Sequence, residues 1–179
     1  MSVFLQPLGT VSVGTSNPST IVFSNIPQTY TDLKILISSR SSLTQIYGSG
    51  ELQFNSDTSG SGTNYSMTRI AGTGSGAGSQ NSPNSAGIAS WDANGSSSTS
   101  NTFNNAEIYI PNYAGSNYKQ VIIDDVVENN GSTGYQILLA GLWRSTAAIT
   151  SVTINLANGP ATFNQYSVAS LYGVLRQGI

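Results

Sequence analysis

The sequence predicts an all-β protein, a two-layer antiparallel β-sandwich of about ten short strands joined by long polar loops. Three observations support this prediction. Short segments recur in which apolar and polar residues alternate, which is the period of a strand with one buried face. Clusters of Gly, Pro, Asn and Ser separate these segments and are typical of turns. No segment shows sustained apolar spacing of three and four residues, so little helix is expected.

The stretch 20–40 contains the pattern that the rest of the chain repeats. Its first predicted strand, Thr20–Asn25, carries β-branched and aromatic residues, and its second, Leu33–Arg40, has Leu or Ile at every second position from 33 to 37. Pro27 lies between the two strands and cannot donate a backbone hydrogen bond to a sheet. The chain is therefore expected to turn at this proline before the second strand begins.

Four more strands are predicted in the first half of the chain. Leu8–Val13 comes before the stretch just described and ends at a glycine. Glu51–Asn55 and Asn64–Ile70 alternate apolar and polar residues on either side of a Ser/Gly turn. Ile88–Trp91 is a brief apolar segment that is expected to form a short strand.

Residues 72–105 are predicted to be mostly long polar loops. The tract Gly72–Gly87 has only alanines as apolar side chains, and Asp92–Asn105 is a second polar tract. Loops of this length are uncommon in compact domains unless they make functional contacts. Both tracts are therefore expected to contact other molecules.

Five strands are predicted in the second half of the chain. Ala106–Ile110 ends at a proline, and Tyr118–Glu128 contains a run of Val and Ile. Tyr135–Arg144 is apolar on both faces, which favours a central strand covered by a second layer. Ile149–Leu156 has the most regular alternation, and Ser167–Leu175 closes the fold.

The chain of 179 residues suits a single domain, 1–179, that can bury a core without disulfides. Residues 1–8 are predicted to be an N-terminal contact segment. Alternation within the predicted strands also indicates which side chains point inward. The predicted core positions are Phe23, Leu33, Ile35, Ile37, Ile123, Leu139, Val152, Ile154 and Leu171.

Composition argues against several classes of function. The chain has no Cys and no His, which removes disulfides, thiolate nucleophiles, the usual zinc ligands and the commonest general base. Only 8% of residues are charged and the net charge is −2, so neither nucleic acid nor a membrane is an expected partner. The first residues lack a basic region, and no apolar run has the length of a membrane span. The chain is therefore expected to be soluble and made without a signal peptide.

Three motifs that resemble chemical sites are better interpreted as structure. Asp124 and Asp125 are adjacent in a predicted strand, so their carboxylates should point to opposite faces, as in a solvated strand end or a subunit contact. Asp57–Gly62 has one acidic residue where a calcium loop needs several. Gly72–Gly78 lacks the Gly-Lys-Ser/Thr ending of a phosphate-binding loop. We therefore predict no catalytic, cofactor-binding or metal-binding residues.

Aromatic residues are numerous for so polar a chain, with nine Tyr and two Trp. These side chains anchor interfaces and stack on sugar rings, although burial in a core or between subunits is their commoner use. We predict an interface that uses large aromatic side chains and the apolar residues near the N-terminus. The candidate interface residues are Met1, Val3, Phe4, Leu5, Tyr47, Trp91, Tyr113 and Tyr118.

Five stretches together resemble a family of virion proteins of tailed bacteriophages. In that family a strand, an Ile-Pro corner and a second strand open a jelly-roll-like domain, and a strand containing Ser-x-x-x-Leu-Tyr-Gly closes it. The resemblance spans nearly the whole chain and implies a jelly-roll-like β-sandwich in a structural protein. The stretches that carry it are Phe23–Leu33, Phe54–Asp57, Asn64–Ser66, Glu107–Tyr113 and Ser167–Gly173.

The resemblance implies a non-enzymatic protein on the outer surface of a phage particle, made in the host cytoplasm and without a cofactor. Because no attachment region precedes the first strand, we expect a head decoration (cement) protein rather than a fibre. Such a protein would be a homotrimer that binds the major capsid protein and bridges neighbouring capsomers. The alternative is a tail or head fibre module that contacts host surface glycans. A sandwich-type esterase or glycosidase is disfavoured because His and paired acids are missing.

Overall fold

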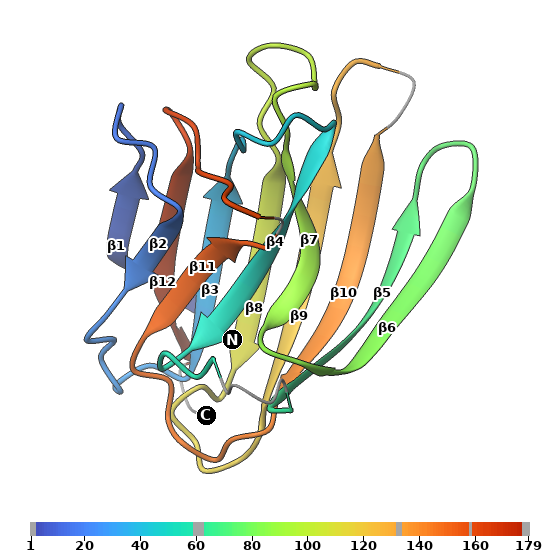
Figure 1. Cartoon of the computed structure of the whole chain (residues 1–179). Coiled ribbons are helices and arrows are strands. Elements are labelled where there is room, and N and C mark those ends of the chain that lie inside the picture. The colour runs from blue at the N-terminus through green and yellow to red at the C-terminus, as the bar shows by residue number, and fades with distance from the viewer. Residues whose placement is uncertain (1–2, 59–62, 132–133, 158, 177–179) are drawn as a thin grey trace.

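The computed structural model describes residues 3–58, 63–131, 134–157 and 159–176, which form twelve strands and no helix. Accordingly, these residues include no helix long and apolar enough to cross a membrane. Figure 1 shows the strands in two layers, with the larger sheet behind the smaller one. The strands are β1 (Val3–Ser12), β2 (Thr20–Phe23), β3 (Asp32–Ser38), β4 (Tyr47–Phe54), β5 (Tyr65–Gly72), β6 (Ala77–Ser85), β7 (Ile88–Asn94), β8 (Asn105–Pro111), β9 (Lys119–Val127), β10 (Tyr135–Trp143), β11 (Val152–Leu156) and β12 (Val168–Arg176).

The order of the strands in the two sheets is that of a jelly roll. The larger sheet runs β1-β12-β3-β8-β9-β10-β5-β6, and the smaller sheet runs β2-β11-β4-β7. Strands β1 to β4 alternate between the sheets, and each pairs antiparallel with a late strand: β1 with β12, β2 with β11, β3 with β8 and β4 with β7. This arrangement of two interlocked Greek keys confirms the predicted β-sandwich.

Two hairpins extend the larger sheet beyond the jelly roll. Strand β9 continues the sheet next to β8, and β10, β5 and β6 follow in that order. The smaller sheet covers part of this extension, because β7 packs against β9, β10 and β5. In Figure 1 the β5–β6 hairpin lies at the right-hand edge, beyond the strands of the smaller sheet.

The core lies between the two sheets, and all nine positions predicted for it are buried. The largest buried side chain, Trp91 on β7, packs against the backbone of Gly50, its partner residue on β4. A Cβ atom at position 50 would lie 2.1 Å from the Trp91 ring, so a glycine is required there. Phe54 and Tyr65 extend this aromatic cluster to Trp143 on β10.

The structure corrects the prediction that residues 72–105 are mostly loops. Residues 77–85 form β6, and β7 extends to Asn94. Strand β6 is an edge strand that pairs only with β5 and leaves most of its residues exposed. Edge pairing uses backbone groups that any residue other than proline supplies, and Pro83 is tolerated because β6 has one free side. A strand with no buried face has no apolar alternation, so its composition resembles that of a loop.

Strand β10 is a central strand under a second layer, as predicted, because it lies between β9 and β5 and β7 packs against it, but only one of its two apolar faces is buried. Its residues alternate between buried and exposed, and Leu138 on the outer face is 46% exposed. Ile122 on β9 and Ile70 on β5 are likewise about half exposed, at 50% and 58%. The outer surface of the larger sheet therefore keeps exposed apolar side chains on three adjoining strands, β9, β10 and β5.

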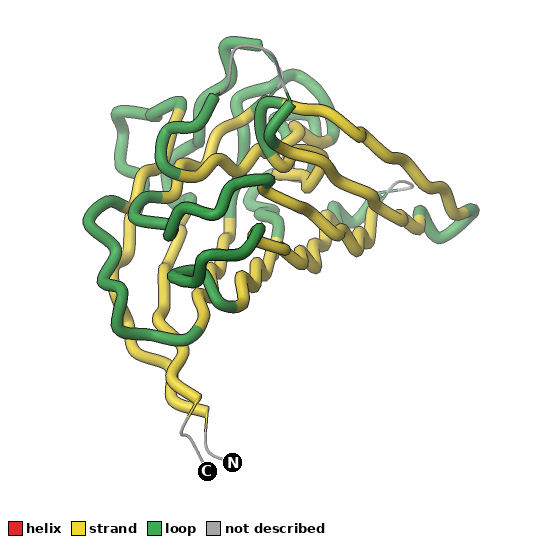
Figure 2. The backbone as a smooth tube through the Cα atoms, turned by 90° about the horizontal axis from the view of Figure 1, so that it is seen from below, coloured by secondary structure: helices red, strands yellow, loops and turns green. Residues whose placement is uncertain are grey.

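Residues 3–8 of the predicted N-terminal contact segment belong to β1. Val3 to Pro7 pair with residues 172–176 of β12, and a bulge follows between Pro7 and Gly9. Figure 2 shows the start of β1 and the end of β12 running side by side away from the body of the sandwich. Phe4 and Leu175 face each other across this pair and are 61% and 39% exposed. Deleting residues 3–8 would therefore remove more than half of a paired strand.

Candidate functional site

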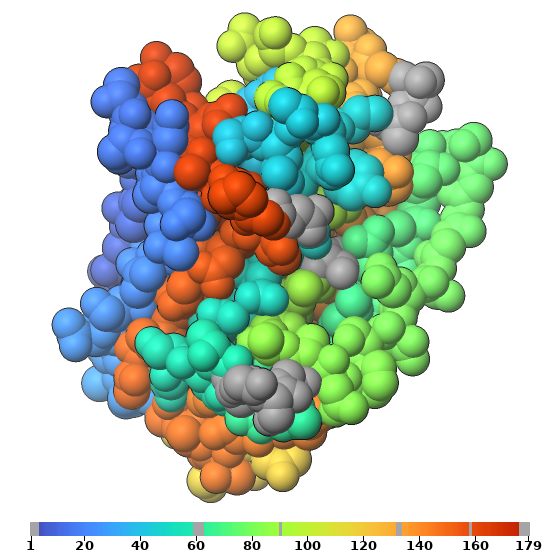
Figure 3. All heavy atoms as spheres, viewed as in Figure 1, coloured from blue at the N-terminus to red at the C-terminus, as the bar shows by residue number. Residues whose placement is uncertain are grey.

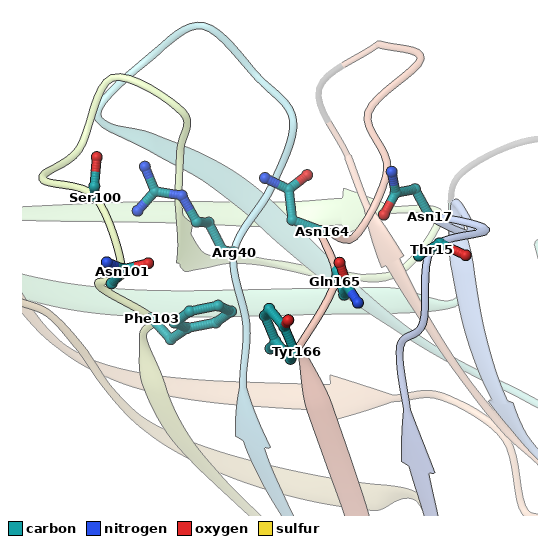
Figure 4. Close-up of a pocket in the computed structure, with 9 residues that line it drawn as sticks. All are labelled: Thr15, Asn17, Arg40, Ser100, Asn101, Phe103, Asn164, Gln165 and Tyr166. Atoms are coloured by element: carbon teal, nitrogen blue, oxygen red, sulfur yellow. The ribbon is translucent and has the colours of Figure 1, made fainter.

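A pocket of about 600 Å³ lies at one end of the sandwich, where four loops meet. The loops connect β1 with β2, β3 with β4, β7 with β8, and β11 with β12. Figure 3 shows atoms from these distant parts of the chain gathered at the upper end of the molecule, and Figure 4 shows the pocket itself. We call it the end pocket. Its lining residues are Thr15, Asn17, Arg40, Ser100, Asn101, Phe103, Asn164, Gln165 and Tyr166.

Tyr166 is the most unusual residue of the end pocket. Its backbone has φ of 73°, a left-handed conformation that costs a non-glycine residue about 1–2 kcal/mol. Two backbone hydrogen bonds hold it there, from Tyr166 N to Val13 O at 2.9 Å and from Ser167 N to Asn164 O at 3.1 Å. The side chain is 73% exposed, so its ring gains little from packing within the chain. Strain combined with exposure indicates a contact outside the chain.

The end pocket also carries side-chain amides that are free to bind a ligand. Asn17 and Asn101 have φ of 45° and 64°, a conformation that asparagine tolerates well in turns. The amide groups of these two residues, of Asn164 and of Gln165 make no hydrogen bond to any other described residue. Each amide offers both donor and acceptor atoms. The pocket therefore presents four unpaired amides around one exposed and one partly exposed aromatic ring.

Arg40 fixes the loop that forms one wall of the pocket. Its side chain is 9% exposed, and both terminal nitrogens donate hydrogen bonds to backbone carbonyl groups. All of these carbonyl groups belong to the loop 96–102, and no carboxylate of the described residues accepts a hydrogen bond from Arg40. The acceptors are the carbonyl oxygens of Ser96, Ser98, Thr99 and Thr102, at 2.9–3.3 Å.

The charge of Arg40 has no acidic partner. The two ion pairs among the described residues are Lys34–Glu107 and Arg69–Asp92. Burial lowers the pKa of Arg40, but an arginine stays protonated at physiological pH. Among the nine described residues that line the end pocket, it is the only charged one. Arg40 therefore places one positive charge in the wall of the pocket.

A second polar cluster is buried between the sheets. Asp125 on β9 accepts hydrogen bonds from the backbone N of Asp92 at 2.7 Å and from Asn104 Nδ2 at 2.9 Å. Arg69 Nη1 lies 3.8 Å from Asp92 Oδ2. Burial raises the pKa of Asp92 to about 7 and that of Asp125 to about 6. Both carboxyl groups are almost fully enclosed, and the cluster ties β5, β7 and β9 together.

Comparisons with protein-family models, curated proteins and solved structures find no match. The interpretation of the end pocket and of the outer sheet surface therefore depends on their own chemistry. The part of the chain that the structure describes holds no group of three acidic side chains that could bind a metal ion. The candidate site is therefore the end pocket, whose lining includes two aromatic rings, four amides and one cationic side chain.

The structure separates the predicted interface residues. Trp91 and Tyr113 are completely buried in the core, which overturns their assignment to an interface. Large aromatic side chains bury much apolar area, and these two fill the interior between the sheets. Tyr47 packs edge-on against Tyr135, with ring centroids 4.8 Å apart. The exposed candidates are Phe4, Leu5 and Tyr118, at 61%, 47% and 56%.

None of the predicted interface residues lines the end pocket. Val3 lies in β1, and Met1 is outside the described residues. The sequence contained only weak signals for the pocket. Tyr166 was one aromatic residue among many, and the Asn17-Pro18 pair indicated no more than a turn.

Asp125 corrects another prediction. The adjacent pair Asp124 and Asp125 was expected at a solvated strand end or a subunit contact. The two side chains do point to opposite faces, as the strand period requires, with Asp124 exposed. Asp125, however, is fully buried in the polar cluster with Asn104, a residue that no sequence motif linked to it.

Proposed function

We propose that this chain is a non-enzymatic virion structural protein, a capsid decoration (cement) protein that acts as a homotrimer and bridges neighbouring capsomers on the outer head surface. The jelly-roll order of the strands agrees with the resemblance of the strand-end motifs. The observation that carries the proposal is the exposed apolar surface of the larger sheet. Such a surface is typical of a protein that docks on another protein.

The docking surface is contiguous across three strands. Leu138 and Ile70 are partner residues of β10 and β5, and Ile122 is the partner of Ala140 on β10. A groove of about 350 Å³, with mostly apolar walls, lies beside Leu138 and Ile70. Single exposed apolar residues are common, but a continuous set this close together indicates an interface. We call Ile70, Ile122, Leu138 and Ala140 the outer sheet face.

Charge at the rim favours a different protein as the partner of this face. Asp124 is exposed next to Leu138 and forms none of the ion pairs found among the described residues. Glu107, the next residue across the sheet, is paired with Lys34 at 2.7 Å. An apolar partner surface with a basic side chain would complement Asp124. We assign this partner as the capsid protein, while the homotrimer uses other surfaces.

Replacing Ile122 with aspartate is expected to reduce binding to phage heads by about tenfold or more. A buried Ile contributes roughly 1.5–3 kcal/mol to an interface, and the new carboxylate would add a desolvation penalty. The fold should be unaffected because Ile122 is 50% exposed. The measurement is occupancy of purified, undecorated heads as a function of protein concentration, with the mass of the free protein determined in solution.

The matched control for this experiment is Val22→Asp. Val22 is also a β-branched strand residue with 50% exposure, but it lies on β2 of the other sheet. This variant should decorate heads like the wild type, and both variants should keep the mass of a trimer. Equal occupancy for Ile122→Asp and Val22→Asp would contradict the docking role of the outer sheet face.

The end pocket favours a second role, that of a tail or head fibre module that contacts host surface glycans. Accessible aromatic rings beside free amides are suited to sugars, and a cement protein needs no such site. Imaging of particles that carry the labelled chain separates the two roles, because a cement protein covers the head and a fibre module sits at a fibre. Inhibition of phage adsorption by the isolated protein would support the fibre role.

A further inference from the structure

We propose that the end pocket is a saccharide-binding site. In this site Tyr166 and Phe103 stack on the apolar face of a sugar ring, and the amides of Asn17, Asn101, Asn164 and Gln165 bind its hydroxyl groups. The inference gives the fibre role a specific site and ligand class. It can be tested on the isolated protein, wherever the chain is located in a particle.

The two aromatic rings form the apolar part of the site. Figure 4 shows Phe103 and Tyr166 at the same level of the pocket, nearest the strand ends, with the polar side chains above them. Phe103 is partly exposed and Tyr166 is 73% exposed. Sugars have C–H groups on one ring face that pack against aromatic rings. An exposed tyrosine held in a strained backbone is explained by such a contact, since asparagine or glycine would adopt the same backbone more easily.

The amides supply the polar part of the site. A sugar hydroxyl both donates and accepts hydrogen bonds, and an amide group can satisfy neighbouring hydroxyls in both ways. The four amides come from three different loops and have no hydrogen bond to another described residue. Three of them lie within two residues of an aromatic residue of the pocket. Gln165 directly precedes Tyr166, Asn164 precedes Gln165, and Asn101 lies two residues before Phe103. The volume of about 600 Å³ is typical of small-ligand sites.

Arg40 determines the charge of the saccharide. Both terminal nitrogens donate to oxygens of the 96–102 loop, so Arg40 contributes positive charge and does not donate to the ligand itself. No acidic side chain is among the described residues that line the pocket. The site therefore accepts neutral or carboxylate-bearing sugars and rejects sugars with a free ammonium group.

The test uses the isolated full chain and three probes: neutral hexose oligosaccharides, uronate-containing oligosaccharides and cationic chitosan oligosaccharides. Binding is measured by calorimetry and by ligand-observed NMR up to millimolar concentrations. We expect binding to members of the first two classes and none to chitosan fragments. No binding to any neutral or acidic probe, or preferred binding to chitosan, would overturn the proposal.

Variants connect the binding to the pocket. Tyr166→Asn should weaken saccharide binding by at least about tenfold and leave the melting temperature equal to or above that of the wild type. Tyr166→Phe should keep most of the affinity, because stacking needs the ring. Gln165→Ala should weaken binding several-fold without affecting folding. Tyr118→Asn, which replaces a 56% exposed tyrosine outside the pocket, is the matched control and should bind normally.

The outcomes separate this inference from the docking role. Ile122→Asp should lose head binding and keep saccharide binding, and Tyr166→Asn should do the reverse. If Tyr166→Asn and Gln165→Ala both bind sugar like the wild type, the end pocket is not the site. That result would contradict the saccharide site but not the decoration role. Normal head binding by Ile122→Asp would contradict the docking role of the outer sheet face but not the saccharide site.

Discussion

Replacing Arg40 with methionine is expected to lower the free energy of unfolding by about 3–4 kcal/mol. The side chain donates hydrogen bonds to four backbone carbonyls of one loop, and methionine donates none. Each carbonyl left without a donor in a buried site costs roughly 1–3 kcal/mol, although the loop can open and expose some of them to water. For a chain of this length the melting temperature should fall by roughly 10 °C. Denaturant unfolding measures the effect.

Arg144→Met is the matched control for Arg40→Met. Arg144 also donates to several backbone carbonyls, including those of Tyr65 and Pro83, but it is only partly buried and lies outside the end pocket. Water can replace its hydrogen bonds, so its loss should cost less than about 1 kcal/mol. Equal destabilisation by the two variants would show that burial of Arg40 does not determine its contribution.

Hydrogen exchange locates the effect of the Arg40 variant. The backbone N of Ser96 donates to Leu43 O at 2.7 Å, and Gly95 N donates to Ile46 O at 2.8 Å. Both amides should lose protection in Arg40→Met, while amides of β9 and β10 keep theirs. Saccharide binding should fall as well, because Asn101 and Phe103 are carried by the same loop. If these two amides kept their wild-type protection in Arg40→Met, the role of Arg40 in holding the 96–102 loop in place would be contradicted.

Strands with one buried face could be predicted from the sequence, because burial imposes the period of two on their side chains. Ile154 illustrates this, since it is completely buried and lies between the polar residues Thr153 and Asn155. Strand β6 could not be predicted, because neither of its faces is buried and its backbone pairing leaves no pattern in the side chains. The outer face of β10 shows the converse, an apolar surface without burial. Leu138 is apolar there without being covered by the chain.

The candidate site could not be predicted because it depends on how the chain closes. Asn17, Arg40, Asn101 and Tyr166 are separated by long stretches of sequence and meet only because β1 pairs with β12 and β3 with β8. The conformations that define the pocket are also invisible in the sequence. A tyrosine with positive φ gives no local signal, whereas the same conformation in glycine is expected in a turn.

Stability of the fold is expected to decrease as the pH rises from about 4 to about 7. In the folded state burial raises the pKa of Asp92 from 3.8 to about 7 and that of Asp125 to about 6. Above pH 4 the unfolded chain releases these protons while the folded chain retains them, which favours unfolding. One pKa unit corresponds to about 1.4 kcal/mol, so Asp92 accounts for roughly 4 kcal/mol at most. Burial raises the pKa of Glu51 as well, which adds to the same trend.

Asp92→Asn tests the origin of this pH dependence. Asparagine resembles the protonated acid and cannot ionise, so the variant should be more stable than the wild type at pH 8 and similar to it near pH 4.5. Chemical unfolding across this range gives both profiles. Asp124→Asn removes an exposed carboxylate from β9, next to the buried Asp125, and should reproduce the wild-type slope. A wild-type free energy of unfolding that does not change with pH would contradict the prediction. It would mean that the ion pair with Arg69, which lies 3.8 Å from Asp92, offsets the effect of burial on the pKa of Asp92.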